Sequence, residues 1–136
     1  MNIAAANPVL ANIVVANRRI LVVEDHEDNR RILRDLLSSR GYDLVEAEDG
    51  EQALAMAEDW RPALILMDVQ IPLLDGYEVT RRLKANPVLR AIPVVVVTSY
   101  ALSGDESKAR AAGCNAYVSK PYSARKLLAK IQEYVS

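Results

Sequence analysis

The sequence has few of the residues that form disulfides and metal clusters. Its 136 residues include one cysteine, Cys114, and one histidine, His26. A single cysteine excludes an internal disulfide, and the two residues have none of the spacings of a zinc site. We therefore expect a reducing, cytoplasmic compartment, and we interpret Cys114 as a small, partly buried hydrophobic residue.

Net charge and long hydrophobic runs are also scarce. The 17 basic and 18 acidic residues leave a net charge of -1, so charge does not steer the chain toward DNA or acidic membranes. No apolar run approaches the roughly 20 residues that cross a membrane. The apolar opening 1–18 has no positive charge before its apolar part and is interrupted by Pro8 and Asn12, so we interpret it as an arm, not a signal peptide.

The role of this arm stays open at this stage. Ile13, Val14 and Val15 are costly to leave in water, so packing on the domain, a dimer contact and a partner contact are options beside disorder. The remaining residues, 19–136, have the length of one domain with one core. A composition that is 51% hydrophobic and 26% charged is that of an ordinary globular protein.

After residue 18, short apolar runs alternate with amphipathic segments. Five runs are typical of strands because they are rich in Val, Ile and Leu and lack polar alternation. They cover residues 20–23, 44–47, 64–67, 94–97 and 116–118. Such runs indicate a parallel sheet that is covered on both faces.

The segments between these runs have helix ends. Asp49, Asp75 and Ser103 each stand three residues before an acid or amide, and Ser123 precedes the last amphipathic stretch, as N-cap residues do. Gly41 stands where a left-handed helix stop is expected. The sequence therefore predicts an α/β fold, a (βα)5 flavodoxin-like, doubly wound parallel five-stranded sheet in the order 2-1-3-4-5.

Polar residues follow the ends of the apolar runs, where open parallel sheets bind their ligands. They are Glu24, Asp25, Asp68, Thr98, Ser99 and Lys120. The three carboxylates repel one another, and a hard divalent cation with oxygen ligands relieves this repulsion. Lys120 supplies a point charge and Thr98 a hydroxyl, so the set describes a site for a phosphoryl group carried on Asp68 as nucleophile.

Each residue also has a simpler interpretation. Glu24 and Asp25 fit a helix N-terminus, Lys120 alone is typical of a solvated surface, and Thr98 alone is typical of a strand. Their convergence at strand ends favours the joint site. We interpret His26 as an exposed residue of the first helical turn, because Mg²⁺ prefers oxygen and imidazole prefers softer metals.

Four stretches together resemble the receiver domains of two-component response regulators, in the CheY-like superfamily. They are LVVEDHEDNR, LILMDVQIPLLDG, PVVVVTSYA and YVSKP, in that order, and the resemblance covers residues 19–135. The stretches MDVQIPLLDGYEVTRRLK and AAGCNAYVSKPYS are most similar to stand-alone regulators of the DivK-like type and to receivers fused to hybrid kinases.

The resemblance implies a metal-dependent phosphoacceptor. Asp68 would accept a phosphoryl group from a phosphohistidine, and Asp25, Asp68 and the backbone carbonyl of Gln70 would hold Mg²⁺ or Mn²⁺. Glu24 would support the metal directly or through water.

The resemblance also assigns roles around the phosphoryl group. Lys120 and Thr98 would contact its oxygens, and Tyr117 stands at the position of the family's switch aromatic, with a plain core aromatic as the less favoured alternative. Gln70 and Tyr100 border the path of attacking water in this family, and our hypothesis is that they tune phosphoryl lifetime. The peptide bond after Lys120, which precedes a proline, is expected to be cis.

The implied function is a switch in a two-component phosphorelay, which assists its own phosphorylation and is not an enzyme with a separate substrate. Its partners would be a sensor histidine kinase, a histidine phosphotransfer protein, or both. The fourth helix, fifth strand and fifth helix would form the output surface, and this surface or the arm is a possible dimer contact. Because Ser136 follows the last helix closely, we expect a stand-alone regulator without a DNA-binding domain and without a membrane segment.

Two other protein classes share parts of this pattern. A phosphohydrolase of the haloacid-dehalogenase kind also uses an aspartate nucleophile, but it usually has a second Asp two residues later, where this chain has Gln70. A flavodoxin cradles phosphate in a hydroxyl- and glycine-rich loop after the first strand, and here that loop is EDHEDN. A receiver that never becomes phosphorylated is a further alternative.

Overall fold

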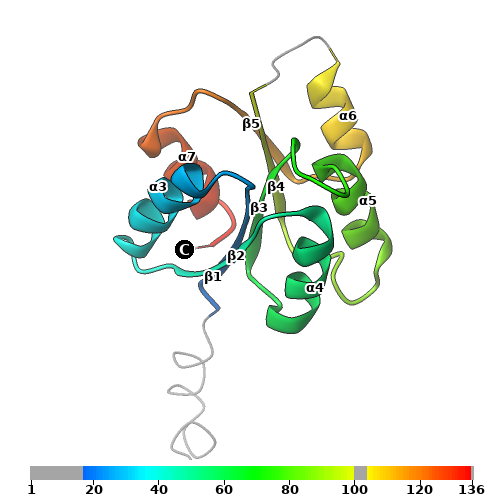
Figure 1. Cartoon of the computed structure of the whole chain (residues 1–136), viewed down its shortest axis with the longest axis horizontal. Coiled ribbons are helices and arrows are strands. Elements are labelled where there is room, and N and C mark those ends of the chain that lie inside the picture. Colours follow the sequence, from blue (N-terminus) through cyan, green and yellow to red (C-terminus); the bar gives the residue numbers. More distant parts are fainter. Residues whose placement is uncertain (1–16, 100–103, 136) are drawn as a thin grey trace, which may run out of the picture.

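A five-stranded parallel sheet forms the centre of the protein, and helices cover both of its faces (Figure 1). The structure is a computed structural model that describes residues 17–99 and 104–135. The strands are β1 (Arg19–Val23), β2 (Asp43–Ala47), β3 (Leu64–Asp68), β4 (Val94–Thr98) and β5 (Ala116–Ser119). The helices are α3 (Glu27–Ser38), α4 (Gly50–Trp60), α5 (Gly76–Ala85), α6 (Asp105–Ala111) and α7 (Ala124–Gln132). The strand order β2-β1-β3-β4-β5 confirms the predicted α/β topology.

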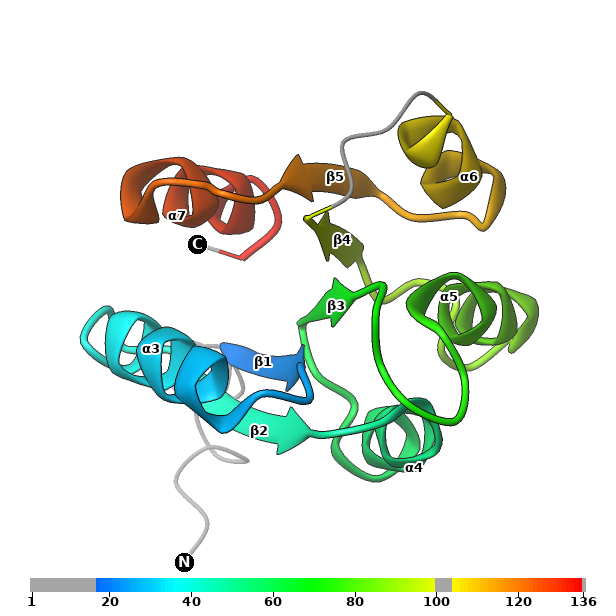
Figure 2. The same ribbon diagram turned by 45° about the horizontal axis from the view of Figure 1, so that its top comes forward.

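The helices form two layers, with α3 and α7 on one face of the sheet and α4, α5 and α6 on the other (Figure 2). Leu37 and Leu127 pack with one row of strand residues, and Ala53 and Val79 pack with the opposite row. Every residue of β3 and β4 is buried, whereas β2 is half exposed at the edge, as its polar flanks indicate. The sheet core therefore forms because near-continuous apolar strands have a helix layer on both sides.

Three strands, β3, β4 and β5, extend one residue further at their carboxyl ends than the apolar runs predict. Asp68 and Thr98 are the last residues of β3 and β4, not the residues after them. The backbone ladder continues because Val69 N–H donates to the Val97 carbonyl at 3.3 Å and Lys120 N–H donates to the Thr98 carbonyl at 2.7 Å. These polar residues are therefore held by sheet hydrogen bonds as well as by their side-chain contacts.

Most of the predicted helix ends are confirmed. Asp49, Asp75 and Ser123 accept backbone N–H bonds at 2.8, 2.9 and 3.1 Å as N-caps. Gly41 has a φ of 83°, the left-handed conformation expected after α3. The predicted cap Ser103 lies outside the described residues, and α6 begins at Asp105.

Residues 1–16 of the predicted arm lie outside the described part of the chain. The last two arm residues pack on the domain. The Asn17 side chain donates to the Arg61 carbonyl at 2.9 Å, and the Arg18 guanidinium lies 4.4 Å from the centre of the Tyr42 ring. Within the described ranges, no helix has both the length and the apolar character needed to cross a membrane.

The first residue of α5, Gly76, lies directly against the end of β3. A Cβ atom added there would lie 2.5 Å from the Asp68 carbonyl oxygen and 2.8 Å from the Val69 Cα, closer than carbon atoms approach in folded proteins. The Gly76 N–H also donates to the Val69 carbonyl at 2.9 Å. The absence of a side chain at this position therefore lets α5 pack on the backbone that carries Asp68.

We predict that Gly76→Ala lowers the free energy of unfolding by about 1–3 kcal/mol, because the methyl group forces α5 away from β3. Urea unfolding measures this loss. Arg81→Ala, on the exposed side of the same helix, is the control and should change stability by no more than about 0.5 kcal/mol. Equal stabilities for the two variants would contradict the close packing of Gly76.

Candidate functional site

The carboxyl ends of four strands bring the predicted polar residues to one edge of the sheet. Glu24 and Asp25 follow β1, Asp68 ends β3, Thr98 ends β4, and Lys120 follows β5. The residues Glu24, Asp68 and Thr98 are buried. The parallel topology thus assembles polar groups that are up to 96 positions apart in the chain.

The Lys120 ammonium bridges two of the carboxylates. It lies 3.0 Å from Asp68 Oδ2 and 3.2 Å from Glu24 Oε1. Lys120 is the first residue after β5. The Lys120–Pro121 peptide bond is cis, as predicted. One cation therefore compensates two acids that lie on neighbouring strands.

Other donors orient both carboxylates. Asp68 Oδ1 accepts the Gln70 N–H at 2.9 Å, so each oxygen of Asp68 has its own donor. Glu24 Oε2 accepts the His26 N–H at 3.2 Å, and Glu24 Oε1 accepts from Asn29 Nδ2 at 3.1 Å. Hydrogen bonds to both oxygens fix the plane of each carboxylate group.

Burial and neighbouring charge shift the pKa values of the three central groups. Burial raises the pKa of Asp68, and the Gln70 N–H and Lys120 only partly offset this. Burial also acts to raise the pKa of Glu24, but the His26 N–H bond and Lys120 outweigh it and lower the net value. Burial acts to lower the pKa of Lys120, but its hydrogen bond to Asp68 and the two negative charges raise it. Lys120 is therefore charged at neutral pH.

A group of candidate metal ligands lies next to this bridge. Donor atoms of Glu24, Asp25 and His26 lie within 4.8 Å of one another. The two carboxylates are the hard oxygen ligands that Mg²⁺ prefers, so the donor set fits a divalent cation. His26 is largely exposed, as predicted, but it is the N-cap of α3 and not part of its first turn, and its Nδ1 lies 3.1 Å from Asp25 Oδ1. Asp68 connects to this group through Lys120.

A cavity of about 620 Å³ opens beside the two carboxylates. Asp68, Lys120 and Ser99 line its polar part, and Ile32 and Tyr122 belong to its apolar part. Asp68 therefore lines an open space, although only 10% of its side chain is exposed.

The other predicted residues surround this centre. The Gln70 side chain accepts a hydrogen bond at 3.3 Å from the Oγ of Ser99, which lines the cavity. Tyr117 lies on β5 and packs, partly buried, against the hydrophobic cluster beneath α4 and α5. Tyr100 lies outside the described residues.

Sequence reasoning missed two residues of α3. Asn29 contacts the Glu24 carboxylate, and Arg30 donates to the Glu24 backbone carbonyl at 2.8 Å. Both lie about one turn after the N-cap His26, where a helix side chain points back toward the strand end. That spacing is the only signal in the sequence that could have identified them.

The site and the fold match a known family. A profile described as the response regulator receiver domain matches residues 20–132. The chain belongs to this family. It is a receiver domain of the kind found in two-component response regulators.

Two curated relatives from Brucella are named polar-differentiation response regulator DivK. The protein from Brucella anthropi is 43% identical over 118 residues, which cover 87% of this chain and 96% of the relative. The protein from Brucella ovis is 42% identical with the same coverage.

Solved structures show the same fold. The receiver domain of a sensor histidine kinase from Pseudomonas aeruginosa, which has magnesium in its active site cleft, has a TM-score of 0.81 and 38% identity, covering 88% of this chain and 98% of that one. The chemotaxis protein CheY4 from Vibrio cholerae has a TM-score of 0.82 and 26% identity, covering 88% of this chain and 100% of that one.

We predict that Lys120→Met lowers the free energy of unfolding by about 1–3 kcal/mol at pH 7, because it leaves two buried carboxylates without their shared cation. Without the ammonium the pKa of Asp68, which burial already raises, rises further, so Asp68 takes up a proton more readily than in the unfolded chain. The deficit should therefore shrink as the pH falls from 7 toward 5.

Urea unfolding at both pH values measures this deficit. Lys126→Met is the matched control, because Lys126 is an exposed lysine of α7. It should have little effect at either pH. A Lys120→Met deficit that is constant with pH would show that repulsion between the two acids is not its cause.

Proposed function

We propose that this receiver domain is a phosphoacceptor switch whose Asp68 receives a phosphoryl group from the phosphohistidine of a sensor histidine kinase or a histidine phosphotransfer protein. The observation that carries the proposal is the Lys120 ammonium 3.0 Å from a carboxylate at the carboxyl end of β3, beside an open cavity. The family match and the relatives named as response regulators support it.

The transfer needs an oriented nucleophile. One oxygen of Asp68 forms a P–O bond as the P–N bond to the donor imidazole breaks, and the imidazole nitrogen keeps the electron pair. The Gln70 N–H and the Lys120 ammonium hold the carboxylate in a fixed plane for this attack. Lys120 then follows the negative charge, because the transfer converts the Asp68 carboxylate into an acyl phosphate whose charge lies on the phosphoryl oxygens.

The carboxylates beside Asp68 would hold a divalent cation during this step. We propose Glu24, Asp25, Asp68 and the backbone carbonyl of Gln70 as the residues that hold Mg²⁺ or Mn²⁺. When bound, the metal would supply positive charge that offsets the negative charge of the transferred group. The magnesium in the cleft of the Pseudomonas aeruginosa receiver supports this assignment.

The switch involves the neighbouring strand pair. Thr98 ends β4 with its side chain buried, and Tyr117 lies on β5 opposite Val96 of β4. We propose that a phosphoryl group on Asp68 attracts the Thr98 hydroxyl and that Tyr117 turns inward into the space this opens. The surface of α6, β5 and α7 would change with it and present a binding face to a partner or to a second copy of the chain.

We predict a labile mass gain of about one phosphoryl group when the wild type is incubated with acetyl phosphate and Mg²⁺. Intact-protein mass spectrometry detects it. Asp68→Asn should gain no mass, because the amide is a poor nucleophile, and a chelator should prevent the gain on the wild type.

Modification of Asp68→Asn to the same extent would exclude Asp68 as the acceptor. The decay of the added mass also tests the hypothesis that Gln70 and Tyr100 tune phosphoryl lifetime. If replacement of both leaves the decay rate unchanged, that hypothesis is wrong.

We also predict that beryllofluoride, a phosphoryl mimic, shifts the amide NMR signals of residues 104–122 in the wild type. The shifts should extend along β5 and α6 because Thr98 and Tyr117 couple the site to that surface. Asp68→Asn is the control and should show none of them. Shifts that stop at the residues around Asp68 would contradict the switch while leaving phosphorylation intact.

A further inference from the structure

A buried arginine lies behind the acidic pair of the site. Arg30 belongs to α3, and only 7% of its side chain is exposed. Its Nη1 donates to the backbone carbonyl of Glu24 at 2.8 Å. A buried charge is costly unless it is paired and hydrogen-bonded, so the partners of this guanidinium determine its role.

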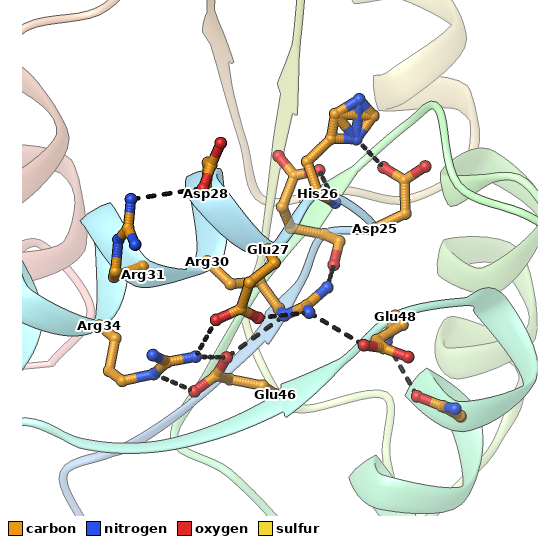
Figure 3. Close-up of polar contacts among 11 residues, drawn as sticks. Asp25, His26, Glu27, Asp28, Arg30, Arg31, Arg34, Glu46 and Glu48 are labelled. Carbon is orange, nitrogen blue, oxygen red and sulfur yellow. Dashed lines mark hydrogen bonds and ion pairs between the residues drawn. The ribbon is translucent and has the colours of Figure 1, made fainter.

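The rest of the guanidinium contacts three glutamates, as Figure 3 shows. Arg30 Nη2 lies 2.6 Å from Glu27 and 2.9 Å from Glu48, and Nε lies 3.4 Å from Glu46. Glu48 is itself held by Gln52 of α4, which accepts its backbone N–H at 2.9 Å. Arg30 thus connects the Glu24 carbonyl to β2 and to the beginning of α4.

The two backbone groups of Glu24 have different kinds of hydrogen-bond partner. The Glu24 N–H still donates to the Ala47 carbonyl at 3.0 Å, so the sheet ladder holds one side of this residue. At its carbonyl the chain leaves the sheet and turns toward Asp25, and there Arg30 takes over as the hydrogen-bond partner. Because both backbone groups of Glu24 are fixed, the direction in which Asp25 leaves the strand is fixed as well.

We propose that Arg30 is a positioning residue for the divalent cation, which sets the backbone orientation from which Glu24 and Asp25 present their carboxylates. The inference rests on the proposed function, because it concerns the same cation site. Groups behind the ligands of a metal commonly orient those ligands and tune affinity. A planar guanidinium suits this role because its donors have a fixed geometry that the lysine ammonium lacks.

Charge alone predicts the opposite effect. A guanidinium near a cation site repels the cation, so loss of Arg30 would strengthen metal binding if only its charge mattered. If Arg30 acts by positioning, its loss weakens binding. The direction of the change therefore separates the two explanations.

The chain offers a matched control on the same helix. Arg34 lies one turn further along α3 and contacts both oxygens of Glu46 at 2.7 Å, and Glu27 at 3.4 Å. Among the described residues, no hydrogen bond or ion pair joins Arg34 to Glu24. Arg34 therefore shares the charge and two carboxylate partners of Arg30 but not its contact with the backbone of the site.

The first test compares Arg30→Lys with Arg34→Lys, because both variants preserve the net charge. Binding of Mn²⁺ by each full chain is measured by electron paramagnetic resonance, with Mg²⁺ as competitor. We expect the dissociation constant to rise about tenfold for Arg30→Lys and to stay within about twofold of the wild type for Arg34→Lys. Urea unfolding measures the stability of both variants. If Arg30 acted only through overall stability, two variants of similar stability would bind Mn²⁺ equally well.

Arg30→Gln then tests the sign of the effect, and it should also weaken Mn²⁺ binding despite removing a positive charge. A second pair of variants covers the case in which replacement of Arg30 prevents folding. Glu48→Gln removes an outer anchor of Arg30 at a side chain that is 60% exposed, and Glu51→Gln makes the same charge change at an exposed position of α4. We expect two- to threefold weaker binding for Glu48→Gln relative to Glu51→Gln.

Three results would overturn the inference alone, provided that the wild type binds Mn²⁺. They are unchanged binding in Arg30→Lys, equal weakening in Arg34→Lys, and tighter binding in Arg30→Gln. If the arginine variants do not fold, equal binding by Glu48→Gln and Glu51→Gln has the same meaning. Failure of the wild type to bind Mn²⁺ at all would instead overturn the cation site itself, and with it the metal-dependent function and the role of Arg30.

Discussion

The bridge from Lys120 to Asp68 and Glu24 is the interaction on which the site depends. Two carboxylates buried at one edge of a sheet repel each other, and neither is stable as an anion without a nearby cation. The ammonium supplies that charge at 3.0 and 3.2 Å, and it arrives from the opposite end of the sequence. This single cation lies between the two acids because of the strand order, the length of β5 and the turn that follows β5.

The apolar strands determine where a carboxylate can lie. Leu64 to Met67 are buried on both faces of the sheet, so the chain can carry a carboxylate only where β3 ends. Gly76 then brings the first turn of α5 against the backbone of that end. The Asp68 carboxylate therefore faces the cavity, while its main chain lies directly against α5. Local rigidity of this kind lowers the cost of orienting a nucleophile for attack.

The fold and the centre of the site follow from patterns in the sequence, whereas the surrounding support does not. Asp68 and Lys120 could be predicted because they stand at the ends of apolar runs, and in a parallel sheet those ends meet. For Arg30 the only signal was its spacing from the N-cap, and this signal is weak because an arginine on an amphipathic helix has the same pattern whether it faces water or the strand behind it. The strand ends were misplaced by one residue because hydrogen bonding, not apolarity, decides where β3 and β4 stop. Tertiary contacts supply that information.

The hydrogen bonds of Glu24 would keep this carboxylate in place if Lys120 moved away during the proposed transfer. Its carboxylate accepts from Lys120, from Asn29 and from the His26 N–H, and the last two donors belong to α3 or to its N-cap. In the proposed mechanism Lys120 follows the phosphoryl group, and Glu24 then loses one donor but keeps two. Its backbone is also held from the side of Arg30, which takes no part in the transfer. In this mechanism the α3 side of the site therefore stays fixed, and the residues that move lie on the side of β4 and β5.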